Sequence, residues 1–105
     1  MQKYIVIVHG QNLLTEIDGV RNRYGFFTNV FIEAFNQADA QSRALEFIRE
    51  DAHVRNVTLN TEGDPLCLSA EEVKEVESFD DARVPRTGLG LYLVVGVNGK
   101  EACKH

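Results

Sequence analysis

Hydrophobic and polar positions alternate with a period of two in two stretches near the start of the chain. These are residues 3–9 and residues 26–35, and such alternation is typical of β-strands. The second stretch is rich in aromatic and β-branched side chains, which suit a pleated surface. Asp18-Gly19 between them is a hairpin-turn signal. We therefore expect one long hairpin, with residues 12–17 extending the first strand as an arm and residues 20–25 forming a polar connector.

A helical pattern follows over residues 37–52. Ala44 and Ile48 belong to an apolar stripe with the spacing of an amphipathic helix. Asn36 can cap the first turn, and Asp39 adds a negative charge there, where the helix dipole favours it. This stretch predicts the main helix of the protein.

The second half of the chain has shorter apolar stretches. Residues 56–60 and residues 89–97 predict strands. Residues 66–78 begin with strand-like alternation, but residues 69–79 also fit a helix. Ser69-Ala70-Glu71-Glu72 matches a capping box, and the apolar residues after it are three apart. A bulged strand could carry the same side chains, so a strand and a helix both remain open here.

Together these elements predict an α+β fold. We expect a single domain over residues 1–105, built on a mostly antiparallel sheet of four to five strands with one main helix on one face. If residues 69–79 are helical instead, the fold becomes a ferredoxin-like sheet with a layer of two helices.

The expected sheet has more apolar surface than one helix can cover. The first, second and last predicted strands are apolar on both faces, whereas a half-solvated antiparallel sheet alternates apolar with polar residues. Large uncovered apolar surfaces usually mark an interface. The cover could be residues 69–79 as a second helix, residues 10–20 folded back as an arm, or a second copy of the chain in a homodimer that forms through a sheet face or a sheet edge.

Charge and composition narrow the classes of partner. The net charge of the 105-residue chain is −5, and residues 62–81 hold eight acidic residues against Lys74 alone. Such a surface repels phosphate backbones, which argues against nucleic acid and leaves a basic protein as a partner for this segment. No apolar run approaches the length of a membrane span, and no signal peptide is evident, so we expect a cytoplasmic protein without a membrane partner.

Candidate ligand-binding residues lie in two places. His9, Arg21 and Arg23 flank the first hairpin, and Arg86-Thr87-Gly88 begins a loop that contains glycine. Backbone amides and an arginine fork of this kind could hold a carboxylate or a phosphate. No helix is expected after the loop, so it matches neither a P-loop nor a dinucleotide fingerprint.

The chemistry-bearing residues form no known catalytic pattern. The three histidines lack ligand spacing, so the sequence predicts no metal and no cofactor. No Ser/His/Asp or Cys/His signature is present, and no catalytic residue is assigned. Glu33 shares a predicted strand face with phenylalanines, where a buried carboxylate could accept a proton. The alternative function is therefore a small enzyme with a site at the helix–sheet or dimer seam, using His9, Glu33 or Arg86.

Five parts of the chain form a recognisable set: Tyr4 to Leu14, Tyr24 to Ala34, Leu59-Asn60 with Asp64-Pro65, Glu71-Glu72-Val73 to Phe79, and Thr87 to Tyr92. Together they resemble a set of short bacterial α+β proteins that have no established activity. The resemblance implies a compact α+β domain, favours a strand in the acidic segment and supplies no catalytic residues. Taken with the surplus apolar surface, it leads us to expect a non-catalytic, self-associating binding or interaction module.

Overall fold

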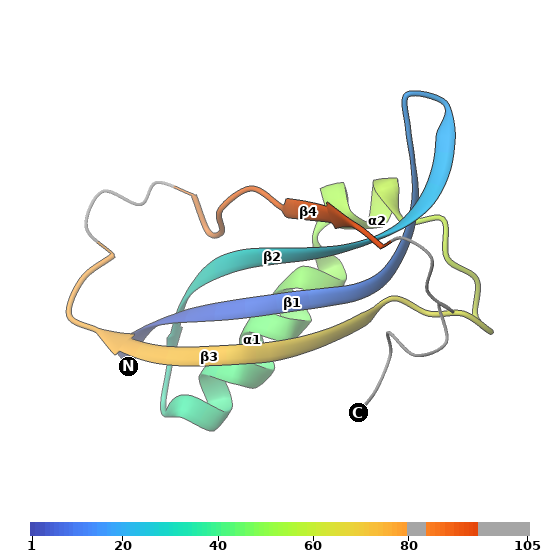
Figure 1. Cartoon of the computed structure of the whole chain (residues 1–105). Coiled ribbons are helices and arrows are strands. Elements are labelled where there is room, and N and C mark those ends of the chain that lie inside the picture. Colours follow the sequence, from blue (N-terminus) through green and yellow to red (C-terminus); the bar gives the residue numbers. More distant parts are fainter. Residues whose placement is uncertain (80–83, 95–105) are drawn as a thin grey trace.

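A computed structural model describes residues 1–79 and 84–94. In these residues an antiparallel four-stranded sheet has the order β3-β1-β2-β4, and helices lie on one of its faces (Figure 1). The predicted α+β class and antiparallel sheet are confirmed. In chain order the elements are β1 (Gln2–Ile17), β2 (Val20–Ala34), α1 (Gln37–Glu50), α2 (Ala52–Val57), β3 (Cys67–Val76) and β4 (Gly90–Leu93).

The predicted hairpin is present, and it is longer than expected. Asp18 (φ 54°) and Gly19 (φ 80°) both have positive φ, as a type I′ hairpin turn requires. Residues 20–25 belong to β2, so the prediction of a polar connector there is wrong: residues 20–24 pair with β1, and their side chains are exposed or half-buried. The register shifts between Gly10 and Leu13, and beyond this bulge the hairpin projects as an arm (Figure 1).

The core lies between the sheet and α1. Val6, Val8 and Val30 face the helix with no exposed surface. Small residues of α1, such as Ala44, let the helix lie close against them. Phe26 lies directly over Gly10 of the neighbouring strand, where a β-carbon would overlap its ring. The hairpin and the helix are therefore joined by one continuous apolar layer.

The predicted helix over 37–52 is confirmed over most of its length, but the strand over 56–60 is wrong. α1 ends at Glu50, and α2 then begins. The carboxylate of Asp51 accepts hydrogen bonds from the backbone N–H groups of His53 (2.9 Å) and Val54 (3.1 Å), so it caps a second helix. Val54 is buried, and this packing overrides the strand preference of the residues after it.

The strand predicted over 66–78 is confirmed as β3, and the alternative of a helix over 69–79 is wrong. β3 pairs with β1, and Glu71 is the extra residue of a bulge where the register shifts between Ile7 and Val8. The bulge places Ala70 and Val73 on the same face of the sheet, three residues apart. The residues three apart that suggested a helix, Val73, Val76 and Phe79, do not share one face: Val73 pairs with Val6 on the helix side, whereas Val76 pairs with Lys3 on the opposite side. The strand predicted over 89–97 is present as β4, while residues 95–97 lie outside the described residues.

Candidate functional site

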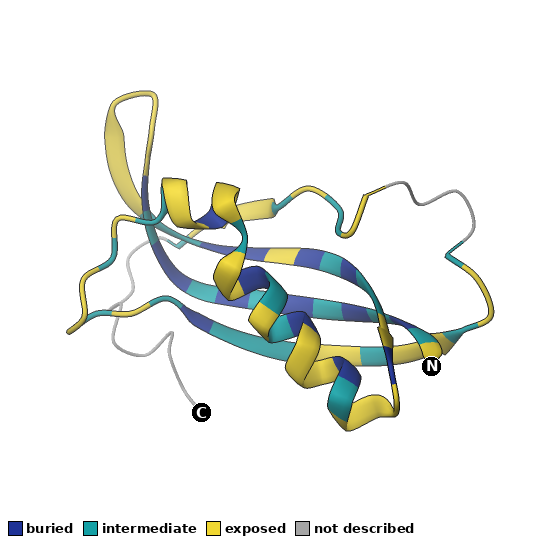
Figure 2. Ribbon diagram, turned by 180° about the vertical axis from the view of Figure 1, so that it is seen from behind, coloured by how far each residue is buried: buried dark blue, intermediate teal, exposed yellow. Residues whose placement is uncertain are grey.

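The helices cover only one face of the sheet (Figure 2). We call the opposite face the open face. The strand registers place four residues on it from each of three strands, together with one residue from β4. They are Lys3, Ile5, Ile7 and His9 of β1, Phe27, Asn29, Phe31 and Glu33 of β2, Ser69, Glu72, Lys74 and Val76 of β3, and Tyr92 of β4.

The centre of the open face is apolar and reachable by solvent. Ile5, Ile7 and Phe31 are half-buried, and Phe27 is 43% exposed. The ring of Phe79, beyond the end of β3, lies 5.8 Å from the ring of Phe31. This contact shelters one end of the face and leaves the other residues of the centre without a covering element in the described part of the chain.

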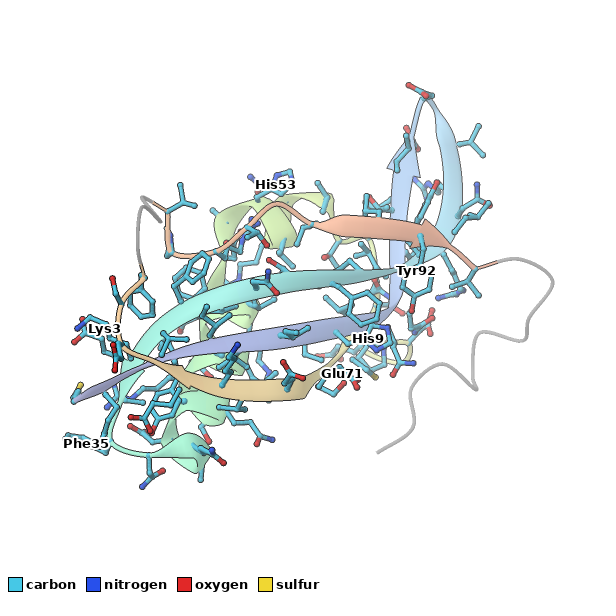
Figure 3. The ribbon with its side chains drawn as sticks, turned by 60° about the vertical axis from the view of Figure 1, so that its left-hand side comes forward. Lys3, His9, Phe35, His53, Glu71 and Tyr92 are labelled. Carbon is cyan, nitrogen blue, oxygen red and sulfur yellow. The ribbon has the colours of Figure 1, made fainter. Side chains whose placement is uncertain are left out.

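His9 is the centre of a polar and aromatic cluster on this face (Figure 3). Its ring stacks on Phe27 with the centroids 4.2 Å apart. Its Nδ1 atom lies 3.2 Å from Oε1 of Glu71, and its Nε2 atom lies 2.6 Å from the hydroxyl of Tyr92. The side chains thus converge from four strands. Glu71 can take part because it is the extra residue of the β3 bulge.

The hydrogen bonds define the proton positions in this cluster. A carboxylate only accepts, so Nδ1 of His9 carries the proton that is donated to Glu71. Burial, followed by the charge of Glu71, raises the pKa of Tyr92 above its ordinary value of 10.0. The hydroxyl of Tyr92 stays protonated, and in the tautomer with the proton on Nδ1 it donates to Nε2 of His9. Both ring nitrogens are occupied, which leaves His9 no free nitrogen with which to act as a base.

A glycine makes room for Tyr92. Gly25 is the register partner of Tyr92, and the tyrosine ring lies over its α-carbon. A β-carbon at position 25 would overlap the ring, so only glycine lets the ring lie against the strand and reach His9.

Arg23 belongs to a second cluster, which attaches a loop to the arm. Its guanidinium lies 2.6 Å from a carboxylate oxygen of Asp64 and donates to the side-chain oxygen of Asn12 at 2.7 Å. Asn12 is buried and donates to Asp64 at 2.8 Å. Hydrogen bonds from Asn12 and then from Arg23 lower the pKa of Asp64. These groups satisfy one another, so the cluster holds the loop after α2 in place.

Arg86 also has an internal partner. Its guanidinium donates to both carboxylate oxygens of Asp51, at 2.7 and 3.1 Å, and each side chain is only 13% exposed. The hydrogen bond from Arg86 is the main cause that lowers the pKa of Asp51 to about 2. Thr87 accepts a hydrogen bond from the backbone of Asn29 at 2.9 Å. The anion that this arginine fork holds is thus a carboxylate of the same chain, and the loop through Gly88 offers no unpaired charge.

The structure does not bring the candidate residues together. His9 lies on the open face, whereas Arg86 is bound to Asp51 at the junction of the two helices. Glu33 pairs in register with Lys3, six positions along the strand from His9, a separation of about 20 Å. Arg21 lies on the arm, 3.4 Å from Glu16. Three pockets among the described residues are lined by other side chains than His9, Glu33 and Arg86, so these pockets give no support to an enzyme built from those three residues.

Two members of the His9 cluster, Tyr92 and Glu71, were not singled out from the sequence. Glu71 looked like part of a solvated acidic stretch, and Tyr92 lies more than eighty positions from His9 in the chain. Gly25 was the available signal, because a glycine in a strand often marks close approach by a neighbouring group. Even so, Gly25 alone does not show which side chain lies against it, because that depends on the register of β4.

No family model, curated protein or solved structure matches the chain. The resemblance to short bacterial proteins therefore stays a prediction. Within residues 1–79 and 84–94, no group of three or more His, Cys, Asp or Glu side chains could hold a metal ion. No helix in the same residues is long and apolar enough to cross a membrane.

Proposed function

We propose that this chain is a non-catalytic binding module that pairs with a second copy of itself through the open face. One observation carries the proposal: the apolar centre of that face, formed by Ile5, Ile7, Phe27 and Phe31, has no cover in the described part of the chain beyond the contact of Phe79. Burying such a surface against its equivalent removes apolar area from water in both copies.

The size of the face suits a modest dimer. Four strands about 4.8 Å apart, over about eight residues that each rise about 3.4 Å, give the face about 500 Å². Two copies packed face to face would bury about 1,000 Å² in total, near the lower limit for specific interfaces. We therefore expect the dimer to dissociate on dilution.

The charges on the open face favour a copy of the same chain as its occupant. The whole chain carries −5, and the open face holds Lys3 and Lys74 against Glu33, Glu72 and Glu71, the last of which is paired with His9. A two-fold axis that runs parallel to the strands, between β1 and β2, places β1 of each copy over β2 of the other. Lys3 of each copy then lies opposite Glu33 of the other, so unlike charges meet.

The edges of the sheet are less suited to self-association than the face. β3 is a charged edge strand with a bulge at Glu71, and both features block pairing with a further strand. β4 is only four residues long. A basic protein at segment 62–81 also has less support than a second copy, because Asp64 and Glu71 already have partners within the chain.

The proposal can be tested by size-exclusion chromatography with light scattering over a dilution series. We expect the wild-type mass to rise above 11.8 kDa toward twice that value as concentration increases. Ile7→Lys puts a charge at the centre of the open face and should leave a monomer. Val20→Lys is the matched control, because Val20 is 55% exposed at the tip of the arm and lies off this face.

Circular dichroism shows whether the two variants remain folded. A wild-type protein that stays monomeric at the highest concentration would refute the proposal. Equal behaviour of folded Ile7→Lys and Val20→Lys would show that association uses another surface.

A further inference from the structure

A cavity of about 260 Å³ lies on the helix side of the sheet, away from the open face. It opens at the base of the arm, between β1, α2 and the segment that leads into β4. Figure 3 labels His53, one of the two α2 residues that line this cavity. Its size is slightly below the roughly 300–1,000 Å³ of pockets for drug-sized ligands, so a molecule of one or two rings would suit it. The walls are mostly aliphatic, formed by Leu13, Ile17, Val57, Leu89 and Leu91, with Thr15, Glu16 and His53 as the polar residues.

Thr15 is the unusual member of this lining. The residue is only 5% exposed, yet its hydroxyl has no hydrogen-bond partner among the described residues. No fully buried polar side-chain atom of the described chain lacks a partner. The oxygen of Thr15 must therefore be one that solvent reaches, and the cavity that Thr15 lines provides the access. A buried hydroxyl without a partner costs free energy unless a ligand or water satisfies it.

The charges around the cavity limit the class of ligand that it can bind. Glu16 lies at the lining, and its negative charge would repel a carboxylate or a phosphate. Arg21, 3.4 Å away, neutralises this charge only in part. The Glu16 carboxylate only accepts hydrogen bonds, and the Thr15 hydroxyl can accept one as well as donate one, so the pair favours a ligand that donates a hydrogen bond. We propose that this cavity binds a small, uncharged, mostly apolar ring compound that carries one hydrogen-bond donor, of the indole or phenol class.

The test is an NMR titration of the full chain with indole, and with indene as a ring of the same shape that lacks the N–H. We expect both compounds to shift the amide signals of Leu13, Leu89 and Leu91 in a saturable way. Thr15→Val should weaken indole binding about fivefold, the value of one hydrogen bond, and leave indene binding unchanged. Thr61→Val is the matched control, because Thr61 is exposed and lies outside the cavity.

A second variant guards against a folding defect in the first. Leu91 is 43% exposed, so Leu91→Trp should fold while its larger ring fills the cavity, and it should abolish the shifts from both compounds. The absence of saturable shifts at millimolar indole would overturn the proposal. So would equal weakening of indole and indene by Thr15→Val. The site does not depend on the proposed dimer, since Ile7→Lys should leave indole binding intact.

Discussion

The ion pair between Asp51 and Arg86 yields the sharpest stability prediction. Asp51→Asn keeps an oxygen that can cap α2, since asparagine is as good an N-cap as aspartate. It removes the negative charge that faces a guanidinium only 13% exposed. Breaking a buried pair by removing one partner costs about 3–5 kcal/mol, and the residual solvent access here sets the expected loss at about 2–3 kcal/mol.

The pKa of Asp51 gives an independent magnitude and a pH window. A fall from 3.8 to about 2 corresponds to about 2.5 kcal/mol, which solvent screening reduces to about 1–2 kcal/mol. Because the folded-state pKa is depressed, this stabilisation is complete above the unfolded value of 3.8 and is lost as the pH falls through about 2. The difference between wild type and Asp51→Asn should therefore shrink below about pH 4.

Urea unfolding followed by circular dichroism, from neutral pH to about pH 2, measures this difference. Asp18→Asn is the control, because Asp18 is exposed in the hairpin turn and asparagine also accepts positive φ. Its stability should stay within about 0.5 kcal/mol of the wild type. A loss below about 0.5 kcal/mol for Asp51→Asn at neutral pH, or a loss that does not change with pH, would refute the reasoning.

Two further variants probe the close contacts of the sheet. Gly10→Ala forces the buried ring of Phe26 to move and should cost about 1–3 kcal/mol in urea unfolding; an unchanged midpoint would contradict the close packing. Tyr92→Phe removes the hydroxyl that donates to His9 and should change the Nε2 signal of the imidazole in long-range ¹H–¹⁵N spectra, whereas Tyr24→Phe should leave that signal unchanged.

The sequence pattern was most informative where one local signal decided the structure. Asp18-Gly19 supplied the positive φ angles of the turn, and Asn36 capped α1 as expected, with its side chain accepting from the backbone of Asp39. The prediction of a strand over 56–60 was wrong because β-branched residues suggested an extended chain, whereas Asp51 caps a second helix that includes part of this segment. Capping and the burial of Val54 outweighed intrinsic propensity.

The candidate site was harder to predict because it depends on register. The surplus apolar face followed from alternation alone, and in residues 1–79 and 84–94 the helices lie on the other side of the sheet. The partners of His9 did not follow, since Glu71 reaches it only through a bulge and Tyr92 only through the pairing of β4 with β2. The arginines were predicted to bind a ligand, but Arg23 and Arg86 form ion pairs with carboxylates that are distant in the sequence. Local sequence does not encode such pairings.

Intermolecular contacts across the open face are the most direct test of the proposed dimer. An isotope-filtered NOE experiment on a mixture of ¹³C-labelled and unlabelled chains detects only contacts between copies. The account predicts NOEs from the methyl groups of Ile5 and Ile7 to the ring protons of Phe27 and Phe31 of the other copy, and their loss in Ile7→Lys. A concentrated sample that gives no intermolecular NOE, or gives them only from residues on the helix side, would contradict it.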